Sequence, residues 1–114
     1  MSVIANRINV AAGATLRNVL ADEKFRMLRA PTIVRGGVVI AFAAVIPGRF
    51  TFTIGDKVVA DNATAPNERA AGAGVDLNTQ LKIADAGLAG DELSLEISNP
   101  GAAAFDMEWY FILG

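Results

Sequence analysis

Residues 105–113, Phe-Asp-Met-Glu-Trp-Tyr-Phe-Ile-Leu, are the stretch that decides the fold of this chain. Apolar side chains recur at every second position from Phe105 to Leu113, and the positions between them carry Asp106, Glu108 and Tyr110. Because successive residues of a strand point to opposite faces, this alternation predicts a long strand with one face laid over a core. The stretch contains the only Trp and the only Tyr of the chain. An apolar strand of this kind promotes aggregation unless the fold or a partner covers it.

Two further stretches alternate in the same way. Residues 49–54 place Phe50, Phe52 and Ile54 on one face. Residues 93–97 place Leu93, Leu95 and Ile97 on one face. Gly55-Asp56 matches a two-residue hairpin connection, because Gly adopts the positive φ that such turns require. We therefore expect residues 38–46, 49–54 and 57–60 to form a three-stranded meander.

The first third of the chain is less regular. Residues 3–10 alternate imperfectly and predict a strand, with an edge position as one option. Residues 14–30 partly satisfy helical spacing, but the pattern favours two strands over a helix. Arg35-Gly36-Gly37 predicts a turn or a bulge. Later in the chain, residues 75–83 are expected to be extended and residues 84–90 to form a loop.

Residues 38–46 are apolar on both faces, which is typical of a strand that is covered twice. The bulkier row, headed by Val38 and Ile40, should enter the core. The smaller row contains Val39, Ala41 and Ala43. It would lie either against another subunit, where small side chains allow close approach, or beneath an internal loop.

Residues 61–74 form a long stretch punctuated by Asn, Pro and Gly, with Ala between them. Long connections in compact domains are often functional loops. This one is either an arm that reaches a neighbouring subunit through Pro66 and Arg69, or a plain connection between sheets. A short helical turn at residues 67–71 is a further option.

The sequence as a whole predicts an all-β protein. Its 114 residues suit one domain, and about eight short strands without a secure helix predict a single-domain antiparallel β-sandwich over residues 1–114, with jelly-roll topology as one option. The longest apolar run, residues 38–46, is too short to span a membrane. No apolar run of signal-peptide length opens the chain, so no secretory leader is expected.

Composition removes several kinds of chemistry. The chain has no His and no Cys, so it lacks the usual proton shuttle, nucleophile pairs and transition-metal ligands. Its formal charge of −2 is spread along the sequence, which argues against a nucleic-acid surface. Asp56, Asp61, Asn62 and Asp76 could offer oxygen atoms to Ca²⁺, but they lack calcium-loop spacing. We therefore expect no cofactor, no metal and no small-molecule substrate.

Asp106 and Glu108 share one face of the last predicted strand. Two carboxyl groups on one face could serve a glycosidase-like reaction. On an exposed strand face, solvation or an ion pair with an Arg of another subunit is the expected role. Nothing in the sequence brings a nucleophile together with a base, so we expect a protein that is not an enzyme.

Several short motifs resemble small virion proteins of tailed bacteriophages. They are Ala11-Ala12-Gly13-Ala14-Thr15 followed by Asn18-Val19-Leu20-Ala21, Gly55-Asp56-Lys57-Val58-Val59, Gly90-Asp91-x-Leu93, and Asn99-x-Gly101-Ala102 before an aromatic last strand. The similarity spans most of the chain and consists mainly of turn chemistry. Residues 26–29 depart from the pattern because they are more basic.

This resemblance implies a capsid decoration, or cement, protein. Such proteins are β-sandwiches that often form homotrimers and bridge major capsid subunits on the outside of an icosahedral shell. It implies the major capsid protein as partner, the capsid exterior as location and synthesis in the host cytoplasm, with no nucleic acid or membrane involved. The alternative is a carbohydrate- or receptor-binding module of a phage tail or fibre, for which Trp109 and Tyr110 are the obvious aromatic residues.

Contact residues follow from the same patterns. The smaller row of residues 38–46, the long loop and the polar face of the last strand are the candidate interface: Val39, Ala41, Ala43, Pro66, Arg69, Asp106, Glu108 and Tyr110.

Overall fold

The computed structural model describes residues 2–21, 23, 26–40, 47–67, 74–77 and 79–114. Within these residues the chain forms eight strands and no helix. The strands are β1 (Ser2–Val10), β2 (Thr15–Leu16), β3 (Thr32–Ile40), β4 (Arg49–Ile54), β5 (Lys57–Thr64), β6 (Ile83–Gly87), β7 (Leu93–Ser98) and β8 (Phe105–Leu113).

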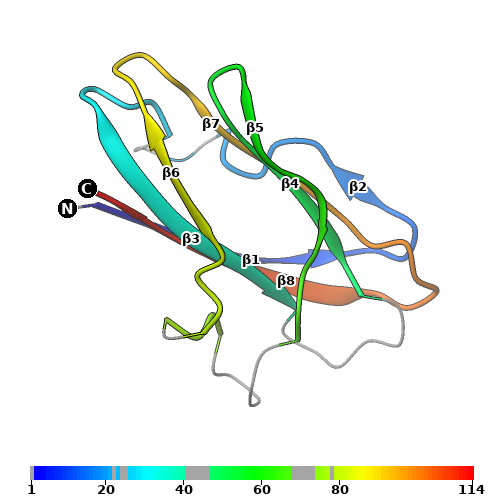
Figure 1. Cartoon of the computed structure of the whole chain (residues 1–114). Coiled ribbons are helices and arrows are strands. Elements are labelled where there is room, and N and C mark those ends of the chain that lie inside the picture. Colours follow the sequence, from blue (N-terminus) through cyan, green and yellow to red (C-terminus); the bar gives the residue numbers. More distant parts are fainter. Residues whose placement is uncertain (1, 22, 24–25, 41–46, 68–73, 78) are drawn as a thin grey trace.

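The strands form two antiparallel sheets of four, which pack face to face as a β-sandwich (Figure 1). Sheet A has the order β1-β8-β3-β6, and sheet B has the order β2-β7-β4-β5. The first strand pairs with the last (β1 with β8), β2 pairs with β7, β3 with β6, and β4 with β5. This is the strand order of a jelly roll. The predicted all-β sandwich is therefore confirmed.

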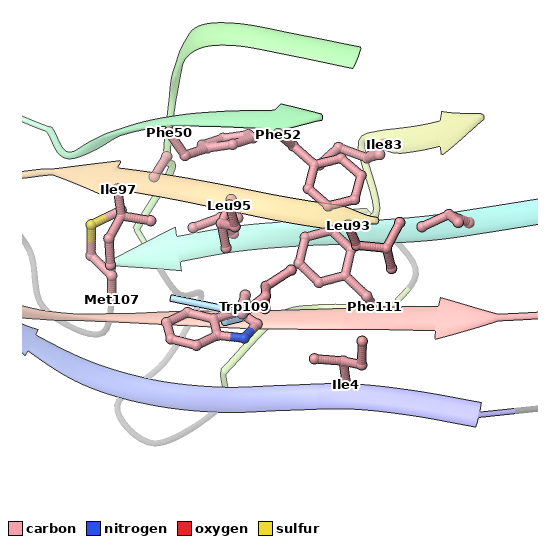
Figure 2. Packing of buried hydrophobic residues seen from close by; sticks show 14 of the residues in the cluster. Ile4, Phe50, Phe52, Ile83, Leu93, Leu95, Ile97, Met107, Trp109 and Phe111 are labelled. Atoms are coloured by element: carbon pink, nitrogen blue, oxygen red, sulfur yellow. The ribbon is translucent and has the colours of Figure 1, made fainter. Parts of the chain in front are cut away.

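The last strand lies inside sheet A, between β1 and β3. Its apolar row is buried and its other row is half-buried, as the alternation predicts. Figure 2 shows Met107, Trp109 and Phe111 meeting side chains of sheet B between the two layers. The rings of Phe111 and Phe52 stack with centroids 4.6 Å apart and planes inclined by 16°. This contact joins the two sheets at the centre of the core.

Strands β4 and β7 confirm the two other alternating predictions. Each buries every second residue, and they pair with each other along their full length. The hairpin between β4 and β5 is also confirmed, with a two-residue turn in which Gly55 has φ of 59°. Local turn chemistry was sufficient here because both strands of the hairpin are adjacent in sequence.

The predicted three-stranded meander is wrong. β3 belongs to sheet A, whereas β4 belongs to sheet B, so the chain crosses from one layer to the other between them. An apolar strand followed by a Pro-Gly turn is compatible with both outcomes. The part of this stretch from residue 41 to residue 46 lies outside the described residues.

Gly36 and Gly37 do not form the predicted turn or bulge, because both lie within β3. A Cβ atom on Gly36 would meet the ring of Phe111, and one on Gly37 would meet the main-chain carbonyl of Gln80. These glycines therefore serve close packing on the two faces of sheet A, a reason that only distant residues supply.

Three other boundaries are corrected. In residues 14–30 the described part contains only the short β2 and an isolated bridge between Met27 and Glu92, instead of two full strands. β5 continues to Thr64, so the long connection begins later than predicted. β6 lies at 83–87, where a loop was expected, and the described residues before it are irregular. These segments carry weak periodicity. The partners of β2 and β6 are remote in sequence, and the pairing of β5 with β4 includes register shifts.

Candidate functional site

The outer face of sheet A carries the polar row of β8. Asp106, Glu108, Tyr110 and Ile112 are half-buried and alternate with the buried core row. The register places residues of β1 on one side of this row and residues of β3 on the other. Three predicted contact residues, Asp106, Glu108 and Tyr110, therefore do share one surface.

Asp106 is bound by two side chains of β1. Its Oδ1 accepts a hydrogen bond from Asn9 Nδ2 at 3.0 Å, and its Oδ2 accepts one from Arg7 Nε at 2.9 Å. The Asn9 hydrogen bond and then the Arg7 bond hold the pKa of the Asp106 carboxyl below its usual value. A carboxyl that stays ionised in this way is a poor proton donor. Asp106 thus finds an Arg partner within its own chain.

Glu108 is less well satisfied than its neighbour. The Arg7 Nη1 atom lies 3.9 Å from Glu108 Oε1, which is an ion pair without a hydrogen bond. Glu108 Oε2 is buried and has no hydrogen-bond partner. Gly74 adjoins this oxygen, and a Cβ atom at Gly74 would collide with it. The side chain as a whole remains 24% exposed, so part of its surface stays open to a partner.

Val39 lies beside Glu108 in the ladder and is completely buried within the single chain. The connection after β5 runs over this face, since Val75 and the main chain of Gln80 adjoin Gly37. The prediction that Val39 meets another subunit is therefore corrected. The alternative was that an internal loop covers this row. It fits Val39, because the connection after β5 places the apolar Val75 on the same face of the sheet.

Gln80 holds this covering connection in place. Its side chain is buried, its Nε2 donates to the Asn67 carbonyl at 3.0 Å, and its Oε1 accepts from the Asp76 main-chain N–H at 2.9 Å. A buried amide that uses both ends in this way is strongly specified in position. The residue carries no sequence signal for this role, because neither contact is periodic or part of a recognised turn.

The remaining predicted contact residues are separated from this surface or lie outside the description. Pro66 is exposed, and its carbonyl accepts a hydrogen bond from the N–H of Ile40 at 2.8 Å at the end of β3. Ala41, Ala43 and Arg69 fall outside the described residues.

A second feature of the outer face is apolar. Val3 and Ile33 are 39% and 52% exposed, and Ile112 lies between their strands with Arg35 beside it. We call these four residues the terminal patch, because Val3 lies near the start of β1 and Ile112 near the end of β8, and these two strand ends lie side by side (Figure 1). Its members come from three strands, so the sequence pattern of any one strand does not reveal it. Only the register across β1, β8 and β3 brings them together.

Among the described residues, no group of Asp and Glu side chains is arranged to hold a metal ion. In the same part of the chain, no helix is long and apolar enough to span a membrane. Comparison of the chain with models of protein families, with curated proteins and with solved structures finds no match. The function must therefore be argued from the surface itself.

Proposed function

We propose that this protein is a non-enzymatic virion structural protein, a capsid decoration protein that oligomerises and bridges major capsid subunits on the outside of an icosahedral shell. The observation that carries the proposal is the terminal patch, where Val3 and Ile33 leave large apolar side chains in water. Contiguous apolar surface of this kind is typical of protein contact sites. The jelly-roll strand order adds support, because jelly rolls recur in viral capsid proteins.

An oligomer suits this work for a physical reason. A decoration protein contacts a repeating shell, and linking several weak contacts multiplies the overall affinity without any new chemistry. The terminal patch would make the contacts between subunits, and a homotrimer is the expected form. The polar row at Asp106, Glu108 and Tyr110 then remains for the major capsid protein, together with the exposed Pro66.

The proposed oligomer is tested by light scattering at micromolar concentration. Ile33→Lys places a charge within the terminal patch and should convert a trimer into a monomer. This monomer should unfold in urea at the same midpoint as the native chain diluted until it is monomeric. Val58→Lys is the matched control, since Val58 is 56% exposed and lies on β5, in the other sheet. A native chain that is monomeric at this concentration contradicts the proposed oligomer.

Capsid binding needs its own experiment. The chain should bind expanded capsids made from the major capsid protein of the same genome, and raise the temperature at which they release their contents. The Ile33→Lys variant should bind at least tenfold more weakly, because it loses the linked contacts. Absence of sedimentation with capsids at saturating concentration contradicts the proposal.

The alternative function, a carbohydrate-binding module, would use exposed aromatic rings on which sugars stack. Jelly rolls also occur in lectins. Trp109 is only 2% exposed and lies in the core, so Tyr110 is the one remaining candidate among Trp and Tyr. This burial favours the decoration protein, and a glycan array with specific hits would reverse that preference.

A further inference from the structure

The middle of β1 is exposed on both faces. Residues 5–9 are all exposed in succession, although the same strand is buried at Ile4 and Val10. β1 is also an edge of sheet A and pairs only with β8 among the described strands. Its outer edge thus presents main-chain groups that no described strand pairs with. The N–H of Arg7 donates to Asn6 Oδ1 at 2.8 Å, a contact that an added strand would replace. We call residues 5–9 of β1 the open edge.

A cleft lies on each side of the open edge. On the outer side, a cleft of about 460 Å³ is lined by Ala5, Arg7, Glu108 and Tyr110, with Val75 and Leu77 of the covering connection. On the inner side, between the two sheets, a cleft of about 620 Å³ is lined by the apolar side chains of Ile8, Leu16, Val19 and Trp109 and by polar ones that include Thr15, Arg17 and Glu23. A strand added to the open edge would direct alternate side chains towards these two clefts.

The two clefts differ in the side chains that they would accept. Glu108 lines the outer cleft, and it shares the cation Arg7 with its neighbour Asp106, so this group of three carries one net negative charge. Arg7 hydrogen-bonds Asp106, and the Oε2 atom of Glu108 has no hydrogen-bond partner. A basic side chain is therefore favoured there. Within the inner cleft, Ile8 is 38% exposed and lies beside Leu16, so an aliphatic side chain is favoured at this one position.

We propose that the open edge binds an extended segment of another protein by strand addition, and that this segment alternates basic and aliphatic residues. Main-chain hydrogen bonds to β1 supply affinity, and the two clefts supply specificity, as in other complexes formed by strand addition. A basic side chain of the partner lies beside the small side chain of Ala5, which pairs with Tyr110 two positions along the same face from the Arg7–Glu108 pair, while an aliphatic side chain covers Ile8.

A second copy of this chain is a poorer occupant of the same edge. Arg7 lies near the middle of β1, so two antiparallel copies of β1 would bring their Arg7 side chains close together on the same face. Each copy would also retain its excess of acidic charge. Charge complementarity therefore favours a basic partner segment over self-pairing.

The inference rests on the proposed function only in that the partner is a protein. It is tested without capsids, by titrating the full chain with short blocked peptides. One peptide alternates Lys and Val, a second replaces Lys by Glu, and a third is the Lys-Val peptide N-methylated at alternate residues. Fluorescence of Trp109, the only Trp in the chain, and amide NMR shifts of β1 report binding.

The Lys-Val peptide should bind at least tenfold more tightly than the Glu-Val peptide, and N-methylation of the edge that faces β1 should abolish binding. Glu108→Gln should lower the affinity of the chain for the Lys-Val peptide about three- to tenfold. Glu96→Gln, on the outer face of sheet B, is the matched control and should change nothing.

Three outcomes overturn the inference. Equal binding of the Lys and Glu peptides would remove the role of charge, and undiminished binding of the N-methylated peptide would remove strand addition. A dimer that forms through β1, seen as amide shifts of residues 5–9 on dilution without peptide, would assign the open edge to a second copy. Capsid binding could still be present in any of these cases, so the two proposals can fail separately.

Discussion

Strands β1 and β8 have the same length and pair residue for residue, yet their surroundings differ. β8 buries one complete row of side chains, whereas β1 exposes five successive residues in its middle. The difference follows from position, because β8 has a neighbouring strand on each side and β1 has one. Pairing alone does not bury a strand. It must also lie beneath the other layer of the sandwich.

This difference separates a structural strand from a binding strand. Side chains of β8 stabilise the fold through contacts with sheet B, so substitutions there should be costly. Side chains in the middle of β1 contribute less to the fold and remain available to a partner. An exposed edge of this kind persists only if something protects it or uses it.

The largest effect is expected for Phe111→Ala in β8. The substitution removes the ring that stacks on Phe52 and leaves a cavity between the sheets. The free energy of unfolding should fall by about 3–5 kcal/mol in urea denaturation. Ile8→Ala in β1 is the matched comparison and should cost less than about 1 kcal/mol, because Ile8 is already partly in water. Similar losses of unfolding free energy for the two variants would contradict the proposed difference between β8 and β1.

A smaller effect is expected for Asn99→Ala, in the turn before β8. Asn99 is buried, and its Nδ2 donates to the carbonyls of Val10 and Ala103 at 3.1 and 2.8 Å. The substitution leaves these carbonyls without this donor, so unfolding free energy should fall by about 1–3 kcal/mol. Asn67→Ala, at an exposed position, should change it by less than about 0.5 kcal/mol. If the two variants unfold alike, Asn99 does not tie β1 to the turn.

The smallest effect concerns the ion pair between the two strands. The pKa of Asp106 is lowered by Asn9 and Arg7, so its stabilisation is present above the ordinary Asp pKa of about 4 and is lost as pH falls through the folded pKa. Asp106→Asn should therefore cost less than about 1 kcal/mol at pH 7, since both partners are partly exposed.

Denaturation curves at several pH values check this last prediction. The difference between the native chain and Asp106→Asn should shrink once the pH falls below the folded pKa of Asp106. Asp61→Asn, an exposed substitution in β5, serves as the control. A difference that persists unchanged to the lowest pH would show that the charge of Asp106 is not its cause.

Much of the sandwich was predictable, because its regular strands and one of its turns are specified by residues close together in sequence. Alternation in β4, β7 and β8 and the turn at Gly55 depend on residues that are adjacent or two apart. The turn at Asn99 was also recognised from its residues, although its hydrogen bond to Val10 was not. The candidate site was predictable only in part, because Asp106, Glu108 and Tyr110 share a face of one strand.

The rest of the site depends on contacts between distant parts of the chain. Arg7 and Asp106 are 99 positions apart, and no pattern in either strand predicts their contact. The assignment of Val39 to a subunit contact failed for the same reason, since the connection after β5 supplies its cover. Gly36 and Gly37 resembled turn residues until packing against Phe111 and Gln80 explained them.

The sequence by itself determined which side chains face the core in the regular strands, because that choice follows from the alternation of neighbouring residues. The tertiary structure alone decided which strand became an edge, which apolar row was covered from within, and which carboxylate oxygen lacked a donor. These outcomes depend on how two sheets stack and how strands are ordered within them. They are set by the summed energy of long-range contacts, which no short stretch of residues contains.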